Sequence, residues 1–339
     1  MKIAIIGAGA IGSIAAAYLH KAGQDVVLIG KEDQVKAIRQ LGLKISGVRG
    51  EETFKLNAAS KLETPVDLII FTTKTQDLEA AYQHNNEYLD DGLILTSQNG
   101  VQADNILSVH VDKDSQLSSI VMFGATYVKP GEVTFNFEGD WIIGKPFRPV
   151  GPKVHEIAEV LGSAFKTVIS QDIVGMKWTK LFVNFNNCIP AAIGRSMQET
   201  FADLDFCRLS VMLLKEGVRI VKKANIELVS LPNFTVEKVY GLAGMPLEQA
   251  AGIINQTLTR LSDKPLYGSI LQSIMRGKLS EIDFINGEIV QLAVGIKDAA
   301  PLNDRIVAMV HEVENTGKFL SVDDVKNAFQ LTEEKTERV

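Results

Sequence analysis

The first residues with a recognisable chemical pattern are three glycines, Gly7, Gly9 and Gly12, spaced as G-x-G-x-x-G directly after a short apolar strand. Gly7 permits a tight turn, Gly9 lets a phosphate approach the backbone, and Gly12 lets the next helix pack against the strand. The N–H groups and dipole at the start of that helix favour negative charge. The loop therefore predicts a dinucleotide-binding site, comprising Gly7, Ala8, Gly9, Ala10, Ile11 and Gly12.

The choice between the two nicotinamide dinucleotides depends on the end of the next predicted strand, residues 26–29. An acidic residue about 20 positions after the glycines usually holds the ribose hydroxyls of NAD. Here the strand is followed by Gly30 and Lys31, and a lysine can neutralise the 2′-phosphate of NADP. Glu32 could hold the ribose of NAD if the loop turned differently, and Lys31 could simply be a solvated loop residue. The pattern favours NADP(H) over NAD(H).

A second group of polar side chains lies in an otherwise apolar helix, predicted over residues 176–193. Lys180 and Asn184 are four positions apart and share a face of this helix. At about 100° per residue, Asn187 points within about 20° of the same direction. A buried polar stripe needs partners, and a substrate is one candidate. The alternative is that these side chains face solvent on an amphipathic helix.

A later segment, residues 269–287, adds two carboxylates, Glu281 and Asp283. Taken alone, such acids are typical of helix N-termini, where the helix dipole favours negative charge. Hydride transfer to a carbonyl needs a proton donor and groups that hold the substrate, and the two segments together contain both kinds of group. Set beside Lys180 and Asn184, the carboxylates favour a substrate site over an exposed stripe.

These motifs occur in the order and spacing of one enzyme family, over the chain up to about residue 315. The chain resembles the ketopantoate reductase (2-dehydropantoate 2-reductase) family in the glycine loop, Thr73-Lys74-Thr75-Gln76, Gln98-Asn99-Gly100, Gly124-Ala-Thr126, Pro130-Gly131-x-Val133, Trp178-x-Lys180-Leu-x-x-Asn184 and Ser269-x-x-Gln272…Glu281-Ile-Asp283. The resemblance implies an N-terminal Rossmann-type, doubly wound α/β domain. It also implies an all-α C-terminal domain like that of 6-phosphogluconate dehydrogenase.

The resemblance also implies a role for each matching residue. Lys180 stands at the position of the general acid that protonates the C2 oxygen, and Glu281 at that of the carboxylate on the hydroxyl side of the substrate. A lysine that loses water in a closed site is a better proton donor near neutral pH. The remaining implied positions are Asn184 and Ser269 for the substrate, Lys74 and Gln76 for the cofactor, and Asn99 for both.

One departure from the family pattern leaves the substrate open. The family commonly has a second asparagine four residues after the first, and this chain has Cys188 there. Asn187 is one position early and can substitute, so both residues are candidate substrate contacts. The leading hypothesis is NADPH-dependent reduction of 2-dehydropantoate to (R)-pantoate, a step toward pantothenate and coenzyme A.

Two other functions are weighed against it. The first is a D-2-hydroxyacid dehydrogenase that acts on another branched or aromatic 2-oxo acid, with NADH as an alternative cofactor. The second is a non-catalytic NADP-binding sensor, because fold alone does not settle function. A sensor has no need of a proton donor, so Lys180, Asn184 and Glu281 argue against it.

The elements that must position these residues fall into two parts. Short apolar runs at 26–29, 67–71 and 92–96 are typical of strands buried on both faces of a parallel sheet. Residues 116–144 have a β-rich pattern that predicts an antiparallel extension at the sheet edge. From Asp172 onward the apolar periodicity is helical. We predict a dinucleotide-binding domain over 1–170 and a helical substrate-binding and catalytic domain over 171–339, with the substrate in the cleft between them.

Composition excludes several classes of function. The net charge of −6 argues against nucleic acid, and no apolar run approaches the roughly 18 residues of a membrane span. Met1 leads directly into a strand, which leaves no room for a signal peptide, and two cysteines make no disulfide framework. We therefore expect a cytoplasmic enzyme with a small-molecule substrate and no metal. Apolar helix faces such as 247–261 would suit a homodimer, although core packing explains them equally well.

Overall fold

The computed structural model describes residues 1–88, 92–262 and 264–331 of the chain. It divides into two compact units, Met1–Lys177 and Trp178–Val339. The division falls inside helix α6 (Ile173–Asn184), whereas the domain boundary predicted from the sequence, between residues 170 and 171, precedes this helix.

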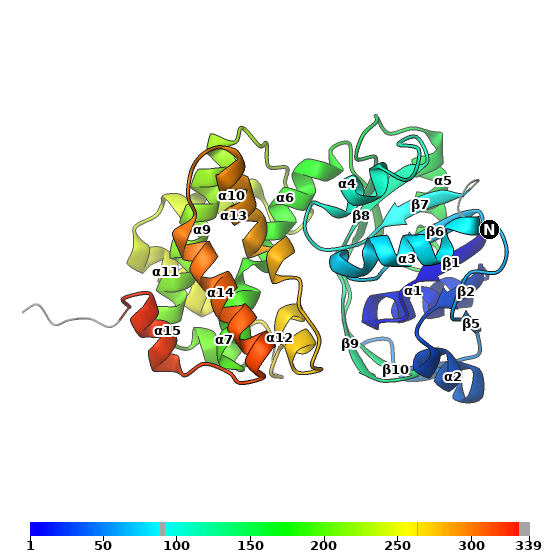
Figure 1. The fold of residues 1–339 in the computed structure, drawn as a ribbon, viewed down its shortest axis with the longest axis horizontal. Coiled ribbons are helices and arrows are strands. Elements are labelled where there is room, and N and C mark those ends of the chain that lie inside the picture. The colour runs from blue at the N-terminus through cyan, green and yellow to red at the C-terminus, as the bar shows by residue number, and fades with distance from the viewer. Residues whose placement is uncertain (89–91, 263, 332–339) are drawn as a thin grey trace, which may run out of the picture. The chain divides into compact units, whose positions relative to one another are not determined.

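The first unit is built on an eight-stranded sheet in the order β12-β11-β8-β7-β6-β1-β2-β5 (Figure 1). Each pair of neighbours is parallel except β8 and β11. The strands are β1 (Lys2–Ile6), β2 (Asp25–Ile29), β5 (Asn57–Ala59), β6 (Leu68–Phe71), β7 (Leu93–Thr96), β8 (Gln116–Val121), β11 (Trp141–Gly144) and β12 (Thr167–Ile169). Strand β1 lies between β2 and β6, so the chain order reverses there, as the doubly wound fold requires.

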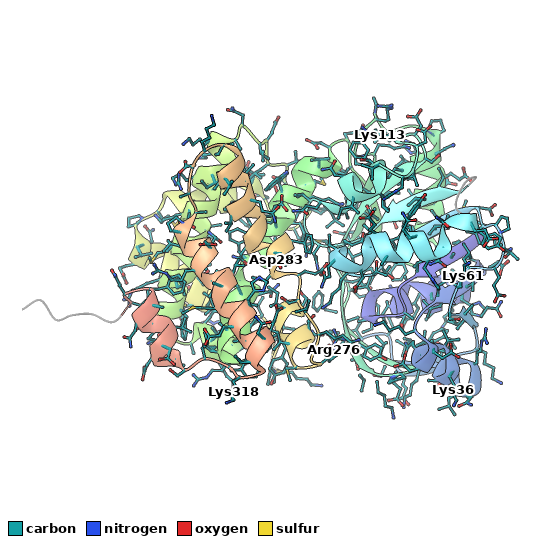
Figure 2. All side chains as sticks on the ribbon, viewed as in Figure 1. Lys36, Lys61, Lys113, Arg276, Asp283 and Lys318 are labelled. Atoms are coloured by element: carbon teal, nitrogen blue, oxygen red, sulfur yellow. The ribbon has the colours of Figure 1, made fainter. Side chains whose placement is uncertain are left out.

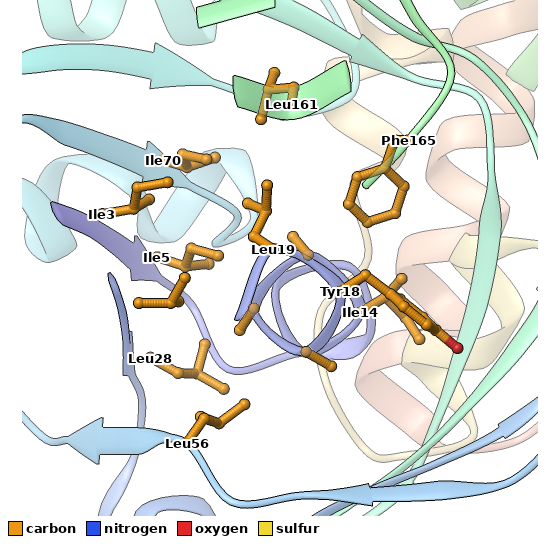
Figure 3. Packing of buried hydrophobic residues seen from close by; sticks show 14 of the residues in the cluster. Ile3, Ile5, Ile14, Tyr18, Leu19, Leu28, Leu56, Ile70, Leu161 and Phe165 are labelled. Atoms are coloured by element: carbon orange, nitrogen blue, oxygen red, sulfur yellow. The ribbon is translucent and has the colours of Figure 1, made fainter. Parts of the chain in front are cut away.

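Helices cover both faces of this sheet because alternate residues of each buried strand point to opposite faces. Ile3 and Ile5 pack with helix α1 and Leu161 in one core (Figure 3). Ala4 and Ile6 belong to a second core on the other face. The predicted doubly wound fold is thus confirmed. The helices of this unit are α1 (Ala10–Lys21), α2 (Glu32–Leu41), α3 (Leu78–Asn85), α4 (Ala103–Ser108) and α5 (Pro152–Gly162), with 3₁₀ turns η1 (Thr75–Asp77) and η2 (Asn86–Tyr88).

A second sheet in this unit corrects the prediction for residues 116–144. Strands β8 and β11 extend the main sheet, but β9 (Gly124–Lys129) and β10 (Glu132–Phe137) join the hairpin of β3 (Leu43–Gly47) and β4 (Glu52–Phe54) in the order β4-β3-β10-β9. Strand β10 runs parallel to β3. Gly47 makes the close approach possible, since a Cβ there would lie 2.0 Å from the Phe135 carbonyl oxygen. Such pairing between distant segments is not visible in local patterns.

The described part of the second unit is helical, with one isolated bridge between Leu231 and Phe234. Helix α9 packs against α10, α11, α13 and α14. The helices are the end of α6, α7 (Cys188–Ile193), α8 (Met197–Phe201), α9 (Leu204–Lys223), α10 (Val236–Gly244), α11 (Leu247–Leu258), α12 (Ser269–Ile274), α13 (Asn286–Gly295), α14 (Pro301–Thr316) and α15 (Val322–Ala328), with 3₁₀ turns η3 (Phe185–Asn187) and η4 (Ile282–Phe284).

The structure also bears on membrane spans, cysteines and metal sites. Among the described residues, no helix combines the length and the apolar character needed to cross a membrane. Cys188 and Cys207 are both free and buried. In the same part of the chain, no three His, Cys, Asp or Glu side chains gather in a way that could hold a metal ion.

Candidate active site

The predicted cofactor residues of the first unit meet at one edge of the main sheet. The last residues of β1, β2, β6 and β7 are in register, because Ile6 pairs with Ile29 and Phe71, and Phe71 pairs with Thr96. The loops that follow these strands therefore start side by side at the carboxyl edge, which is where doubly wound sheets bind ligands. Those loops carry the glycines, Lys31, Lys74 with Gln76, and Asn99.

The glycine loop has the backbone geometry that its motif predicts. Gly7 has φ +121°, and a Cβ there would lie 2.6 Å from the Thr73 backbone nitrogen. A Cβ on Gly12 would lie 2.1 Å from the Gly7 carbonyl oxygen, so only glycine allows α1 this close to the loop. A Cβ on Gly9, in contrast, would meet no protein atom within 4 Å. Gly7 and Gly12 are thus required by the fold, whereas Gly9 borders open space.

The start of helix α1 fits the phosphates of a dinucleotide. The helix begins at Ala10 with Gly9 as its N-cap, and a glycine has no side chain to cap the first N–H groups. The N–H groups of an uncapped first turn, together with the helix dipole, form an anion site. The open space beside Gly9 lets a phosphate reach them, and the buried Thr73 Oγ1 has no hydrogen-bond partner among the described residues. The loop therefore fits a bound dinucleotide.

Hydrogen bonds brace the neighbouring loops. Thr72 Oγ1 donates to the Gly7 carbonyl over 2.8 Å, which ties the loop after β6 to the glycine loop. The buried Gln98 side chain donates to the carbonyls of Phe71 and Thr73, each over 3.0 Å. Thr75 Oγ1 donates to the Asn99 carbonyl over 3.2 Å. Lys74 and Asn99 are half-buried and Gln76 is exposed, so the braces hold predicted cofactor residues in fixed loops.

Lys31 and Glu32 occupy the start of helix α2, next to the glycine loop. A Cβ on Gly30 would lie 2.4 Å from the Ala8 Cβ, so the end of β2 touches the loop. Lys31 is the N-cap of α2 and Glu32 its first residue, and both side chains are exposed. A positive and a negative group are therefore both presented here, as the sequence predicted.

A buried ion pair holds the first half of helix α6 in the first unit. Lys177 Nζ lies 2.8 Å from Asp104 Oδ2, and the side chains are 3% and 5% exposed. The hydroxyl groups of Thr96 and Ser118 also donate to the Asp104 carboxylate. Sequence reasoning missed this pair, because its two members lie 73 positions apart and neither belongs to a local motif.

The second half of the same helix carries the candidate proton donor. Helix α6 is continuous through Lys180 and Asn184, so the two side chains share a face as predicted. Asn184 is buried and Lys180 half-buried, which excludes the alternative of a solvent-exposed stripe. Loss of hydration lowers the pKa of Lys180 to about 8. The ammonium is thus a stronger acid than an ordinary lysine.

The predicted helix over 176–193 is wrong in its middle, which changes the argument for Asn187. Helix α6 ends at Asn184, the 3₁₀ turn η3 follows, and α7 restarts at Cys188. Pro190 explains the break, because proline is tolerated in the first turn of a helix and not in its interior. The projection of Asn187 at 100° per residue therefore does not apply, since a 3₁₀ turn has about three residues per turn.

Tertiary packing nevertheless brings Asn187 to another predicted substrate residue. A Cβ built on Gly268 would lie 2.3 Å from Asn187 Oδ1, so the amide rests against the backbone just before Ser269. Ser269 is exposed at the start of α12. Cys188, in contrast, is fully buried, and its Sγ donates to the Phe185 carbonyl over 3.0 Å. Burial raises the pKa of the Cys188 thiol to about 12, so the thiol is neutral.

Glu281 lies in the short segment between α12 and α13. It is half-buried and directly precedes η4, within the same compact unit as Lys180 and Asn184. Asp283, labelled in Figure 2, contacts His311 of helix α14 at 2.9 Å. This contact joins segments 28 positions apart, so the local sequence around His311 does not signal it.

Comparisons with known proteins identify the family. The model of "Ketopantoate reductase PanE/ApbA" matches residues 3–146, and that of its C-terminal domain matches residues 172–314. The 2-dehydropantoate 2-reductase of Pyrococcus horikoshii is 32% identical over 94% of this chain and 99% of its own length. That of Archaeoglobus fulgidus is 27% identical over 93% and 98%.

Solved structures agree with the family models. D-mandelate dehydrogenase with NADH and anilino(oxo)acetate is 25% identical over 93% of this chain and 99% of its own, with a TM-score of 0.80. A PanE/ApbA family ketopantoate reductase from Ralstonia eutropha matches at the same identity and coverage, with a TM-score of 0.77. With a doubly wound dinucleotide unit, a helical unit and two family models that together cover most of its length, this chain belongs to the ketopantoate reductase family.

Proposed function

We propose that the protein reduces ketopantoate (2-dehydropantoate) to (R)-pantoate, with NADPH as the hydride donor and Lys180 as the general acid. The observation that carries this proposal is the half-buried Lys180, whose pKa is lowered to about 8 one helical turn from the buried amide of Asn184. The names of the curated relatives agree with this substrate.

Lys180 has two tasks in the proposed reaction. A bound nicotinamide cofactor supplies the hydride to C2 of the substrate. As negative charge develops on the C2 oxygen, the Lys180 ammonium stabilises it electrostatically and then transfers a proton to it. With a pKa of about 8, the side chain is still mostly protonated at neutral pH, and it gives up the proton more easily than an ordinary lysine.

The remaining polar residues of the helical unit hold the substrate in this proposal. Asn184 and Asn187 offer amide donors, and Ser269, adjacent to the Asn187 amide, offers a hydroxyl for the substrate carboxylate. Glu281 accepts a hydrogen bond from the 4-hydroxyl group of ketopantoate. Cys188 remains a candidate for specificity, acting from the interior by supporting the adjacent Asn187 rather than through an exposed thiol.

The preference for NADPH rests on charge at the end of β2. In the proposal, Lys31 pairs with the 2′-phosphate, while Lys74, Gln76 and Asn99 contact the remainder of the cofactor from their braced loops. Glu32 is the competing residue, since an exposed carboxylate at this position could hold the ribose of NADH instead.

A second candidate function is reduction of another 2-oxo acid to a D-2-hydroxy acid. The observation that favours it is the likeness to D-mandelate dehydrogenase, solved with NADH and anilino(oxo)acetate, at a TM-score of 0.80. The absence of an asparagine at position 188 points the same way, because the family pattern for holding ketopantoate is altered there.

Initial rates of NADPH and NADH oxidation test both candidates, each measured with ketopantoate and with 2-oxoisovalerate, which lacks the 4-hydroxyl. A strong preference for NADPH and ketopantoate is the expected result. Comparable rates with 2-oxoisovalerate would replace the proposed substrate by a broader class of 2-oxo acids. Sedimentation of the same samples tests whether the protein is a homodimer.

A further inference from the structure

The segment that carries Glu281 has little regular structure of its own. The turn η4 is a single 3₁₀ turn, and Ile285 after it has φ −120° and ψ −88°, outside the helical and extended regions. A turn this short does not fix a side chain by its own hydrogen bonds. The orientation of Glu281 therefore depends on contacts with neighbouring elements.

Helix α14 contacts the segment on each side of Glu281. Before it, the Ser280 backbone N–H donates to Glu314 Oε1 over 2.6 Å. After it, Asp283 Oδ1 lies 2.9 Å from Nε2 of His311. Both partners belong to the last turns of helix α14, three positions apart on one face. Glu281 is thus flanked by two anchors on a single helix.

His311 connects the two anchors. Its Nδ1 lies 3.4 Å from Glu314 Oε2, while its Nε2 faces Asp283. The Glu314 side chain is only 3% exposed, so the carboxylate needs polar partners, which the Ser280 N–H and the imidazole provide. A rigid ring with a nitrogen on each side contacts two carboxylates at once. A glutamine would have a single nitrogen in place of these two.

Helix α14 is itself held firmly. The buried Glu216 of α9 accepts hydrogen bonds from the Leu302 and Asn303 backbone N–H groups, over 3.1 and 2.8 Å, and so caps the start of α14. Val310 and Val313, one position before and two positions after His311, are fully buried. The anchors of Glu281 therefore rest on a helix fixed along its length.

We propose that His311 is a positioning residue that holds Glu281 toward the 4-hydroxyl of the substrate, acting through Asp283 and Glu314. The inference rests on the proposed function, in which Glu281 binds that hydroxyl. It assigns to His311 a part in selecting between 2-oxo acids with and without a 4-hydroxyl group, and no part in proton transfer.

The test compares substrates in the full-length enzyme. In His311→Ala we expect KM for ketopantoate to rise about tenfold with a smaller change in kcat, while kcat/KM for 2-oxoisovalerate stays within about twofold. His311→Gln, which keeps one nitrogen donor group, should lie between the wild type and His311→Ala. In Glu281→Gln the His311→Ala change should have no further effect, because residues that act through one contact are not additive.

Matched controls separate positioning from general damage. His155→Ala changes an exposed histidine of α5, and Glu312→Gln changes an exposed acid on α14 itself. Both variants should leave kcat/KM for ketopantoate and for 2-oxoisovalerate unchanged. If His311→Ala lowered kcat/KM equally for both substrates, or changed neither, the positioning role would be overturned.

A second measurement does not depend on the substrate assignment. Hydrogen exchange of the amides at 280–284 should be about tenfold faster in His311→Ala than in the wild type, and unchanged in Glu312→Gln. Unchanged exchange would overturn the inference. If the wild type itself did not reduce ketopantoate, the proposed function would fail, while the exchange data would still report whether His311 holds the segment.

Discussion

The two halves of helix α6 place the same kind of side chain in different surroundings. In the first half, Lys177 lies against Asp104 at 2.8 Å, and two hydroxyl groups complete the shell of the carboxylate. In the second half, no ion pair joins Lys180 within the described ranges, and loss of hydration lowers its pKa to about 8. The buried lysine that has a counter-ion is part of the packed structure of the fold. The lysine that loses hydration without a counter-ion has a lowered pKa, so its ammonium group gives up a proton more easily.

The largest effect is expected when Lys177 loses its counter-ion. Asp104→Ala leaves a buried ammonium unpaired and should lower the free energy of unfolding by about 3–5 kcal/mol. Urea unfolding of the variant, followed by circular dichroism, measures the loss. The double variant Asp104→Leu, Lys177→Met is the control, because an apolar pair of similar volume should restore most of the stability. If Asp104→Ala lowered the free energy of unfolding by less than about 1 kcal/mol, the prediction for this ion pair would be wrong.

At Lys180 the same type of change should affect rate and leave stability nearly intact. Lys180→Ala removes the proton donor, so kcat should fall about 10²-fold or more, which corresponds to about 2.7 kcal/mol of activation free energy. Steady-state kinetics and NADPH titration measure kcat and cofactor affinity, and the affinity should change little. A variant that keeps most of its rate would remove Lys180 from the mechanism.

The pH dependence of kcat tests the role of Lys180 as proton donor. The proton must be on Lys180 before it can be donated, and the pKa is about 8. The wild-type kcat should therefore be constant below about pH 8 and fall about tenfold per pH unit above it. Lys180→Ala should lack this fall in kcat between pH 7 and 9.5. A fall that persisted in the variant would be due to the titration of another group.

Gly12 and Gly9 of the glycine loop differ in a similar way, because Gly12 is needed for packing and Gly9 is predicted to contact the cofactor. A Cβ on Gly12 would meet the Gly7 carbonyl oxygen at 2.1 Å, whereas a Cβ on Gly9 would meet nothing within 4 Å. Gly12→Ala should lower the free energy of unfolding by about 1–3 kcal/mol through overpacking. Gly9→Ala should change stability by less than about 0.5 kcal/mol and weaken NADPH binding about tenfold. Equal effects of the two variants on stability would contradict this assignment.

The sequence was sufficient to predict the elements whose signals are local. The apolar runs predicted strands buried in a parallel sheet, and the glycine spacing predicted the tight turn and the close helix packing of the glycine loop. The pairing of β10 with β3 and the ion pair of Lys177 with Asp104 were not predictable, because each joins segments far apart in the chain.

In the candidate site, too, local sequence signals were sufficient for some residues and tertiary packing decided the others. Helix periodicity correctly placed Lys180 and Asn184 on one face, but it failed for Asn187, where Pro190 forces the helix to restart. The contact of Asn187 with Gly268 and the anchoring of Glu281 by His311 depend on tertiary packing, so only the structure reveals them. Their consequences for the substrate remain predictions.

The smallest effect is expected at two neighbouring residues of opposite charge, Lys31 and Glu32. Both are exposed, so each interaction is partly screened by solvent. Lys31→Ala should raise KM for NADPH about tenfold, the loss of about one charge-assisted hydrogen bond, and change KM for NADH less than twofold. Glu32→Gln is the matched control, because it should leave KM for NADPH nearly unchanged. Equal effects of Lys31→Ala on both cofactors would reject the 2′-phosphate contact, and a selective rise in KM for NADH in Glu32→Gln would assign the ribose to Glu32 instead.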